Sequence, residues 1–192
     1  MTESEPELLR PGLLADRRIA LCGVAGGGIA GRLGELGARL ETLGEDTLAD
    51  EDQSAAWARE RAPLDALLVD ARARFSDGGP DGLERSLDLA WRAARAVATG
   101  ALIESERPGR LLLIAPPANA GEHAQAARAA LENLARTLSV EWARFGITAV
   151  ALAPGDDTGE PELASVASYL ISPAGAYFSG CVMRLGSLRP AS

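Results

Sequence analysis

The chain has 192 residues, a formal net charge of −8 at pH 7, two cysteines and a single histidine. A chain of this length can bury the core of one domain, and its negative charge disfavours non-specific binding to nucleic acid or to anionic membranes. All 19 basic residues are arginine. Without lysine there is no Schiff base, and one histidine, His123, excludes a histidine-rich metal site, so we expect no metal.

The N-terminal segment mixes acidic and basic residues and lacks the apolar core of a signal peptide. No apolar run approaches the about 20 residues that cross a bilayer. We therefore expect a cytoplasmic protein that does not contact membranes, with an N-terminal extension at 1–16 and one domain at 17–192.

Apolar runs alternate with helical patterns along the rest of the chain. The runs are nearly continuous rather than alternating in polarity, which is typical of parallel strands covered on both faces. The pattern predicts an α/β fold, a Rossmann-like, doubly wound and mostly parallel sheet with helices on both faces. We expect strands at 17–24, 38–44, 64–70, 109–117, 146–155 and 179–187, and helices at 29–40, 50–62, 81–106, 123–145 and 160–172.

Four segments, in order, resemble the short-chain dehydrogenase/reductase family over about residues 17–186. "LDALLVDARA" resembles the fourth strand and its turn, and "RSLDLAW" the helix that carries an asparagine. "ARAALENLARTLSVEWARFGITAVALAPG" is similar to the active-site helix and the strand after it, and "PELASVASYLISPAGAYFSGCVMRLG" to the closing helix and strand. The resemblance implies hydride transfer with NAD(P), assisted by a tyrosine, a lysine, a serine and an asparagine.

The resemblance places none of these four catalytic residues in this chain. The lysine position falls on Arg128, the tyrosine position on Ala124, the serine position on Ala115 or Pro116, and the asparagine position on Ala90. Alanine has no proton to transfer, and arginine does not reproduce the geometry of lysine. The chain is thus identified as a truncated, catalytically degenerate member. A pair formed by His123 and Arg128 is the alternative source of acid–base chemistry.

A glycine-rich turn follows the first predicted strand in "CGVAGGGIAG". Such a turn places a pyrophosphate at a helix N-terminus, so Gly23, Gly27 and Gly28 are the candidate cofactor-binding residues. The spacing departs from that of the family, however, and Arg72 stands where the family has a glycine beside the cofactor. We therefore expect no bound cofactor, with glycines kept for tight packing; retained NAD(P) binding is the alternative.

The two long helices predicted at 81–106 and 123–145 correspond to the family's dimerisation helices. Candidate interface residues lie off their core-facing sides. They are Trp91 with Ala98 on the first helix, and Ala126, Ala130, Asn133, Thr137 and Val140 on the second. An apolar helical stripe that simply packs in the core is the alternative.

Two functions remain open from the sequence. The first is a non-catalytic subunit that assembles with a catalytically active homologue or with itself through the two long helices. The second is an atypical NAD(P)-dependent short-chain oxidoreductase, or a nucleotide- or coenzyme A-binding protein. After "APG", where the family inserts a mobile lid, the chain passes almost directly into its last helix, which favours the first.

Overall fold

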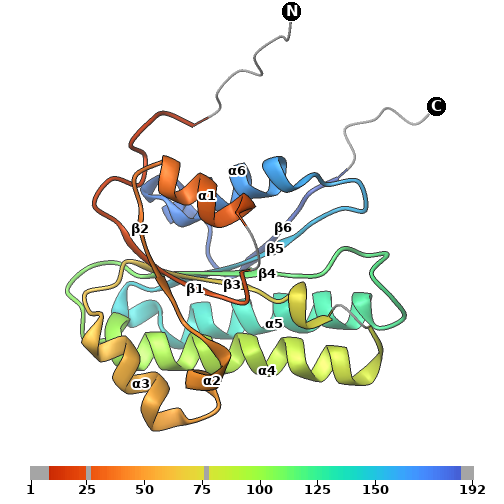
Figure 1. The fold of residues 1–192 in the computed structure, drawn as a ribbon, viewed down its shortest axis with the longest axis horizontal. Helices are drawn as coiled ribbons and strands as arrows, with labels where there is room; N and C mark the ends of the chain where they lie inside the picture. The colour runs from red at the N-terminus through yellow and green to blue at the C-terminus, as the bar shows by residue number, and fades with distance from the viewer. Residues whose placement is uncertain (1–8, 25–26, 76–77, 187–192) are drawn as a thin grey trace, which may run out of the picture.

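The computed structural model describes residues 9–24, 27–75 and 78–186. These residues form a six-stranded sheet in which every neighbouring pair is parallel, in the order β2-β1-β3-β4-β5-β6 (Figure 1). The predicted doubly wound α/β fold is confirmed. The strands are β1 (Arg18–Cys22), β2 (Arg39–Thr42), β3 (Ala66–Asp70), β4 (Arg110–Ile114), β5 (Thr148–Ala153) and β6 (Cys181–Arg184).

Helices cover both faces of the sheet (Figure 1). One face carries α1 (Gly28–Glu35) and α6 (Glu160–Ile171), which pack against each other. The opposite face carries α3 (Glu51–Glu60), α4 (Gly79–Val97) and α5 (Ala124–Glu141), with the short α2 (Glu45–Leu48) beside α3 and α4. Four short helical segments complete the described elements. Three are 3-10 helices, η1 (Ala73–Phe75), η3 (Ala143–Phe145) and η4 (Pro173–Tyr177), and one is a π-helix, η2 (Ala98–Leu102).

Alternate side chains of each central strand enter two separate cores, as the two-residue period of a strand requires. In β3, Leu67 and Val69 pack toward α4, whereas Leu68 packs toward α1 and α6. All of these strand side chains are fully buried. This burial explains why the strands read as continuous apolar runs in the sequence.

The helix predicted at 81–106 is one long helix that changes geometry near its end. It begins at Gly79, and from Ala98 to Leu102 it continues as a π-helix, η2. A side chain at Gly100 would lie 2.8 Å from the carbonyl oxygen of Ala55 in α3. Glycine there lets η2 approach α3 closely.

The described part of the predicted N-terminal extension packs on the domain. Leu14 is fully buried in the α1–α6 core, and its backbone N–H donates to the carbonyl of Leu36 at 2.9 Å. The division into an extension and a domain stays a prediction. None of the helices in the described ranges combines the length and the apolar character that crossing a bilayer requires.

Candidate functional site

The candidate site lies where the strand order reverses, at the carboxyl ends of β1 and β3. The chain leaves β1 toward β2 on one side, and β3 lies on the other side. In open α/β sheets, ligands bind in the crevice at this switch point. The segment after β1 contains the glycine turn and leads into α1, and the segment after β3 contains Arg72.

Packing explains one of the three glycines in the turn. Gly23 has φ +69°, and a Cβ there would lie 2.4 Å from the backbone oxygen of Asp70 and 2.9 Å from Leu89 of α4. Any side chain would collide with β3, so the fold itself requires Gly23. Gly27, by contrast, has open space around its Cβ position. Gly26 lies outside the described residues.

The side chain that lies against Gly28 comes from a residue far away in the sequence. A Cβ on Gly28, the first residue of α1, would lie 2.6 Å from Cγ and 3.0 Å from Oε1 of Glu160. Glu160 is the first residue of α6. Its carboxylate therefore lies against the N-terminus of α1, where the fold would otherwise present backbone N–H groups to a ligand.

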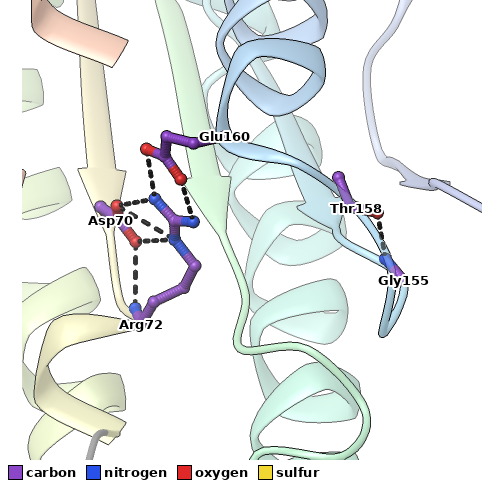
Figure 2. Close-up of polar contacts among 5 residues, drawn as sticks. All are labelled: Asp70, Arg72, Gly155, Thr158 and Glu160. Atoms are coloured by element: carbon purple, nitrogen blue, oxygen red, sulfur yellow. Dashed lines mark hydrogen bonds and ion pairs between the residues drawn. The ribbon is translucent and has the colours of Figure 1, made fainter. Parts of the chain in front are cut away.

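Arg72 joins two carboxylates from different elements (Figure 2). Its Nε donates to Asp70 Oδ1 at 2.9 Å and its Nη2 to Asp70 Oδ2 at 2.7 Å. On the other side, Nη1 donates to Glu160 Oε2 at 2.8 Å and Nη2 to Oε1 at 3.1 Å. We call Asp70, Arg72 and Glu160 the Arg72 bridge; it fastens the start of α6 to the end of β3.

The opposite charges of Arg72 and Glu160 stabilise each other in the Arg72 bridge. Burial alone would lower the pKa of the Arg72 guanidinium, but the hydrogen bonds to Asp70 and Glu160 outweigh burial and raise it. The hydrogen bond from Arg72 holds the pKa of Glu160 below its usual value, against a smaller opposing effect of burial. Arg72 and Glu160 are therefore both ionised near neutral pH. By formal charge, the two carboxylates and one guanidinium of the bridge leave one negative charge at the glycine turn.

The residues at this turn do not fit a dinucleotide pyrophosphate as they stand. A pyrophosphate needs the N-terminus of α1 free and a net positive surrounding. Here the Glu160 carboxylate lies at that N-terminus, and the Arg72 guanidinium is already bound on both sides. Arg72, which the resemblance places where the family has a glycine beside the cofactor, lies between Asp70 and Glu160 at this turn.

Two clefts adjoin the turn. One of about 510 Å³ lies on the β2 side, and its lining includes Gly23, Leu43 and Glu45. The other, of about 480 Å³, is lined by Gly27 and Gly28 together with the three residues of the Arg72 bridge and Ala73. The bridge residues thus line the second cleft, and Ala73 belongs to both.

The tyrosine position is filled by a neighbouring aromatic ring. Ala124, at the start of α5, is fully buried in a small cluster with Phe75 and Ala127. Phe75 belongs to η1, directly after Arg72 and Ala73 in the chain, and is itself 1% exposed. Ala124 is therefore closed off from solvent by its neighbours.

The lysine position has become a structural contact. Arg128 Nη1 donates to the carbonyl oxygens of Pro116 at 2.8 Å and Pro154 at 2.7 Å. These carbonyls follow β4 and β5, so the guanidinium ties together the ends of two strands. Burial and then nearby Arg184 lower the pKa of Arg128, and Asp156 opposes them.

The remaining catalytic positions offer no reactive group. Ala90 and Ala115 are buried in the α4–α5 core, and Pro116 is also buried. His123 precedes α5 and caps no backbone N–H with its side chain. Among the described residues, no hydrogen bond or ion pair joins His123 to Arg128, whose guanidinium bonds the two carbonyls instead.

The Cys22 thiol beside the glycine turn is not a reactive thiolate. Burial raises the pKa of the Cys22 thiol to about 12, with a smaller opposing effect of Arg74. Cys22 is therefore protonated at neutral pH and inaccessible. No group of three His, Cys, Asp or Glu side chains in the described part of the chain is placed to hold a metal ion.

The segment that connects β5 to α6, where the resembled family has its lid, is short and is held by hydrogen bonds. Only residues 154–159 connect β5 to α6. Within them the Gly155 backbone N–H donates to Thr158 Oγ1 at 2.8 Å, which closes a tight turn (Figure 2). The Asn119 N–H donates to Asp156 at 3.0 Å and anchors the same turn from the β4 side. A compact turn stands where a lid would be.

The candidate interface residues of the two long helices are mostly at the surface. Trp91 of α4 and Val140 of α5 are 44% and 76% exposed. Ala126, Asn133 and Thr137 are exposed, and Ala130 is half-buried. Ala98 is fully buried at the start of η2, so its assignment to the interface is wrong: it lies one helical turn after the buried Ala94, on the same core-facing side.

Sequence reasoning missed Phe75 and Glu160. A helical or strand period does not reveal Phe75, because it lies in a single turn between elements. The arginine at position 72 indicated that an acidic partner should lie nearby, but the sequence offers several acidic residues and does not show which one pairs with it.

Similarity to known proteins is found in structure and not in sequence. No protein-family model matches the chain, and no curated protein matches it in sequence. The structure resembles the citronellol catabolism dehydrogenase AtuB of Pseudomonas aeruginosa PAO1, with 24% identity and a TM-score of 0.72 over 93% of this chain and 96% of that one. It also resembles a short chain dehydrogenase from Mycobacterium smegmatis, with 20% identity and a TM-score of 0.72 over 93% and 95%.

A third similar structure is the RhlG/NADP active-site complex of Pseudomonas aeruginosa, with 22% identity and a TM-score of 0.68 over 92% of this chain and 98% of that one. The chain therefore has the fold of the short-chain dehydrogenases/reductases. This confirms the resemblance read from the sequence at the level of the fold.

Proposed function

We propose that the chain is a non-catalytic member of the short-chain dehydrogenase/reductase family. It works as a subunit that assembles with a catalytically competent homologue, or with a second copy of itself, through α4 and α5. The observation that carries the proposal is the tyrosine position, where Ala124 is buried beneath Phe75. A general acid must reach the substrate with a suitable pKa, and this position can supply neither.

The remaining positions support the same conclusion. Arg128 binds two backbone carbonyls, and the buried alanines at 90 and 115 have no polar group. Without a lid, a hydride-transfer site would stay open to water. Loss of every catalytic group and of the lid favours a role in which no turnover is needed.

Assembly is supported by what the surface exposes. Trp91 and Val140 are two of the three large apolar side chains exposed among the described residues. They lie on α4 and α5, which pack side by side on one face of the sheet (Figure 1). The stripe around Val140 continues through small or neutral side chains that permit close helix approach: Ala126, Ala130, Asn133 and Thr137.

The test is the oligomeric mass of the purified full chain by light scattering after size exclusion. We expect an assembly at micromolar concentration and at least tenfold weaker assembly after Val140→Asp, because a charge would be buried in the contact. Thr42→Asp adds the same charge on the exposed edge strand β2 and should leave the mass unchanged. Equal masses for Val140→Asp and the unmodified chain would exclude this face.

The second candidate, an atypical NAD(P)-dependent oxidoreductase or a nucleotide- or coenzyme A-binding protein, has one observation in its favour. The cleft of about 510 Å³ beside the glycine turn is lined by Glu45, an acid of the kind that binds ribose hydroxyls in this fold, although its carboxylate is paired with Arg74. RhlG, with the same fold, is an NADP complex. Saturable micromolar binding of NADH or NADPH to the unmodified chain would favour this candidate.

A further inference from the structure

The carboxylate of Glu160, from the same chain, lies beside the N-terminus of α1. The first backbone N–H groups of a helix have no partner within the helix and attract negative charge. No side chain caps α1, and Gly27 precedes it. The Glu160 side chain lies so close to Gly28 that a Cβ there would be 2.6 Å from its Cγ and would displace it.

The same carboxylate is held from the other side. Arg72 donates hydrogen bonds to Glu160 from Nη1 and Nη2, and to Asp70 from Nε and Nη2. All three nitrogens of the guanidinium are used, and the Asp70 side chain is only 5% exposed. Bidentate pairs of this kind are strong and fix the side chains in one geometry.

We infer that the Arg72 bridge takes the place of a dinucleotide pyrophosphate at the glycine turn of the chain's own cofactor crevice. Glu160 supplies the negative charge at the helix N-terminus, and Arg72 supplies the cation that binds it. A pyrophosphate could enter only by displacing Glu160 from Arg72 and by approaching the second carboxylate, Asp70. This inference goes beyond the proposed assembly and does not depend on it.

The bridge makes a specific prediction for removal of one group. In Glu160→Ala, the carboxylate at the α1 N-terminus is gone, and Arg72 keeps Asp70 but has Nη1 free to bind a phosphate oxygen. The local charge changes from negative to neutral, and the crevice beside Gly27 and Gly28 opens. Glu160 is 43% exposed in its side chain, so the variant should stay folded.

The experiment is calorimetric titration of the full chain with NADH, NADPH and inorganic pyrophosphate. We expect Glu160→Ala, and Glu160→Gln in the same direction, to bind at least one of these at least tenfold more tightly than the unmodified chain. Glu162→Ala is the matched control, because it removes an exposed carboxylate from the same first turn of α6. It should bind like the unmodified chain.

Two results would overturn the inference. One is tight NAD(P) binding by the unmodified chain, equal to that of Glu160→Ala. The other is no gain in either Glu160 variant while its thermal unfolding stays cooperative. The oligomeric mass, measured on the same samples, tests the proposed function separately, since Glu160 lies on neither α4 nor α5.

Discussion

Arg72 and Glu160 lie 88 positions apart in the sequence, yet the guanidinium of one donates two hydrogen bonds, of 2.8 and 3.1 Å, to the carboxylate of the other (Figure 2). The pair links the end of β3 to the start of α6 across the crevice that this fold uses for ligands. A crevice that would hold a cofactor is thus spanned by an internal contact that also stabilises the domain.

Replacing Arg72 should destabilise the protein. In Arg72→Ala the nearly buried carboxylate of Asp70 loses its cation, and an unpaired buried charge costs several kcal/mol; because the Arg72 side chain is 25% exposed, we expect a loss of about 2 kcal/mol in the free energy of unfolding. Urea denaturation measures it. Arg95→Ala, which breaks an exposed ion pair with Glu51, should cost less than about 1 kcal/mol.

A double variant separates the buried charge from general damage. If Asp70 is the origin of the loss, Asp70→Ala combined with Arg72→Ala should recover part of the stability, because the nearly buried carboxylate is then gone and only the more exposed Glu160 has lost its cation. Strictly additive losses for the two substitutions would contradict the coupling.

The Arg72 bridge should also make stability depend on acid pH. The pKa of Glu160 is lower in the folded protein than its usual value, so its ionised form contributes stability that is fully present above the unfolded pKa of about 4.3. That contribution is lost as the pH falls through the folded pKa. The melting temperature of the unmodified chain should therefore exceed that of Glu160→Gln at pH 7, and the difference should shrink as the pH falls below about 4. A difference that stays constant from pH 7 to pH 3 would argue against the ion pair.

Restoring two catalytic residues should not restore catalysis. Ala124→Tyr with Arg128→Lys recreates the tyrosine and lysine of the resembled family, but Phe75 occupies the space of the new ring. Overpacking should cost about 2 kcal/mol, and NAD(P)H consumption with carbonyl substrates should stay at background. Gln125→Tyr, at the exposed neighbouring position, should change stability by about 0.5 kcal/mol or less. Turnover in the double variant would contradict the closed site.

Gly23 and Gly27 should respond differently to alanine. Gly23→Ala places a Cβ 2.4 Å from the Asp70 carbonyl in a left-handed backbone, and should cost about 2 kcal/mol or more. Gly27 has φ −85° and open space, so Gly27→Ala should be neutral or stabilise slightly. Thermal unfolding of both variants measures this. Equal losses would mean that the turn is not kept for packing against β3.

The sequence predicted the layers of the fold well because each central strand is buried on both faces. Strands such as β3 read as unbroken apolar runs, and the acids at the start of α3 and α6 marked two helix beginnings. Local signals of this kind depend on neighbours in the chain. The π-helical geometry from Ala98 to Leu102 has no such signal.

The candidate site could be predicted only in part. Arg72 stood out because a large cation replaced a glycine, and Gly23 because it ends a strand. The pairing of Arg72 with Glu160 and the packing of Phe75 over Ala124 depend on contacts between distant or irregular segments. No residue period encodes such contacts. The sequence therefore pointed to Arg72 but not to the residues that it or Ala124 contacts.

The central claim, a non-catalytic subunit that works by assembly, is tested most directly by native mass spectrometry of the full chain isolated gently from its own host. The account predicts a stoichiometric assembly, either with a homologue that carries an intact Tyr-x-x-x-Lys motif or with further copies of the same chain, and no dinucleotide on this chain. A lone chain, or any species with one dinucleotide mass for each copy of this chain, would contradict it.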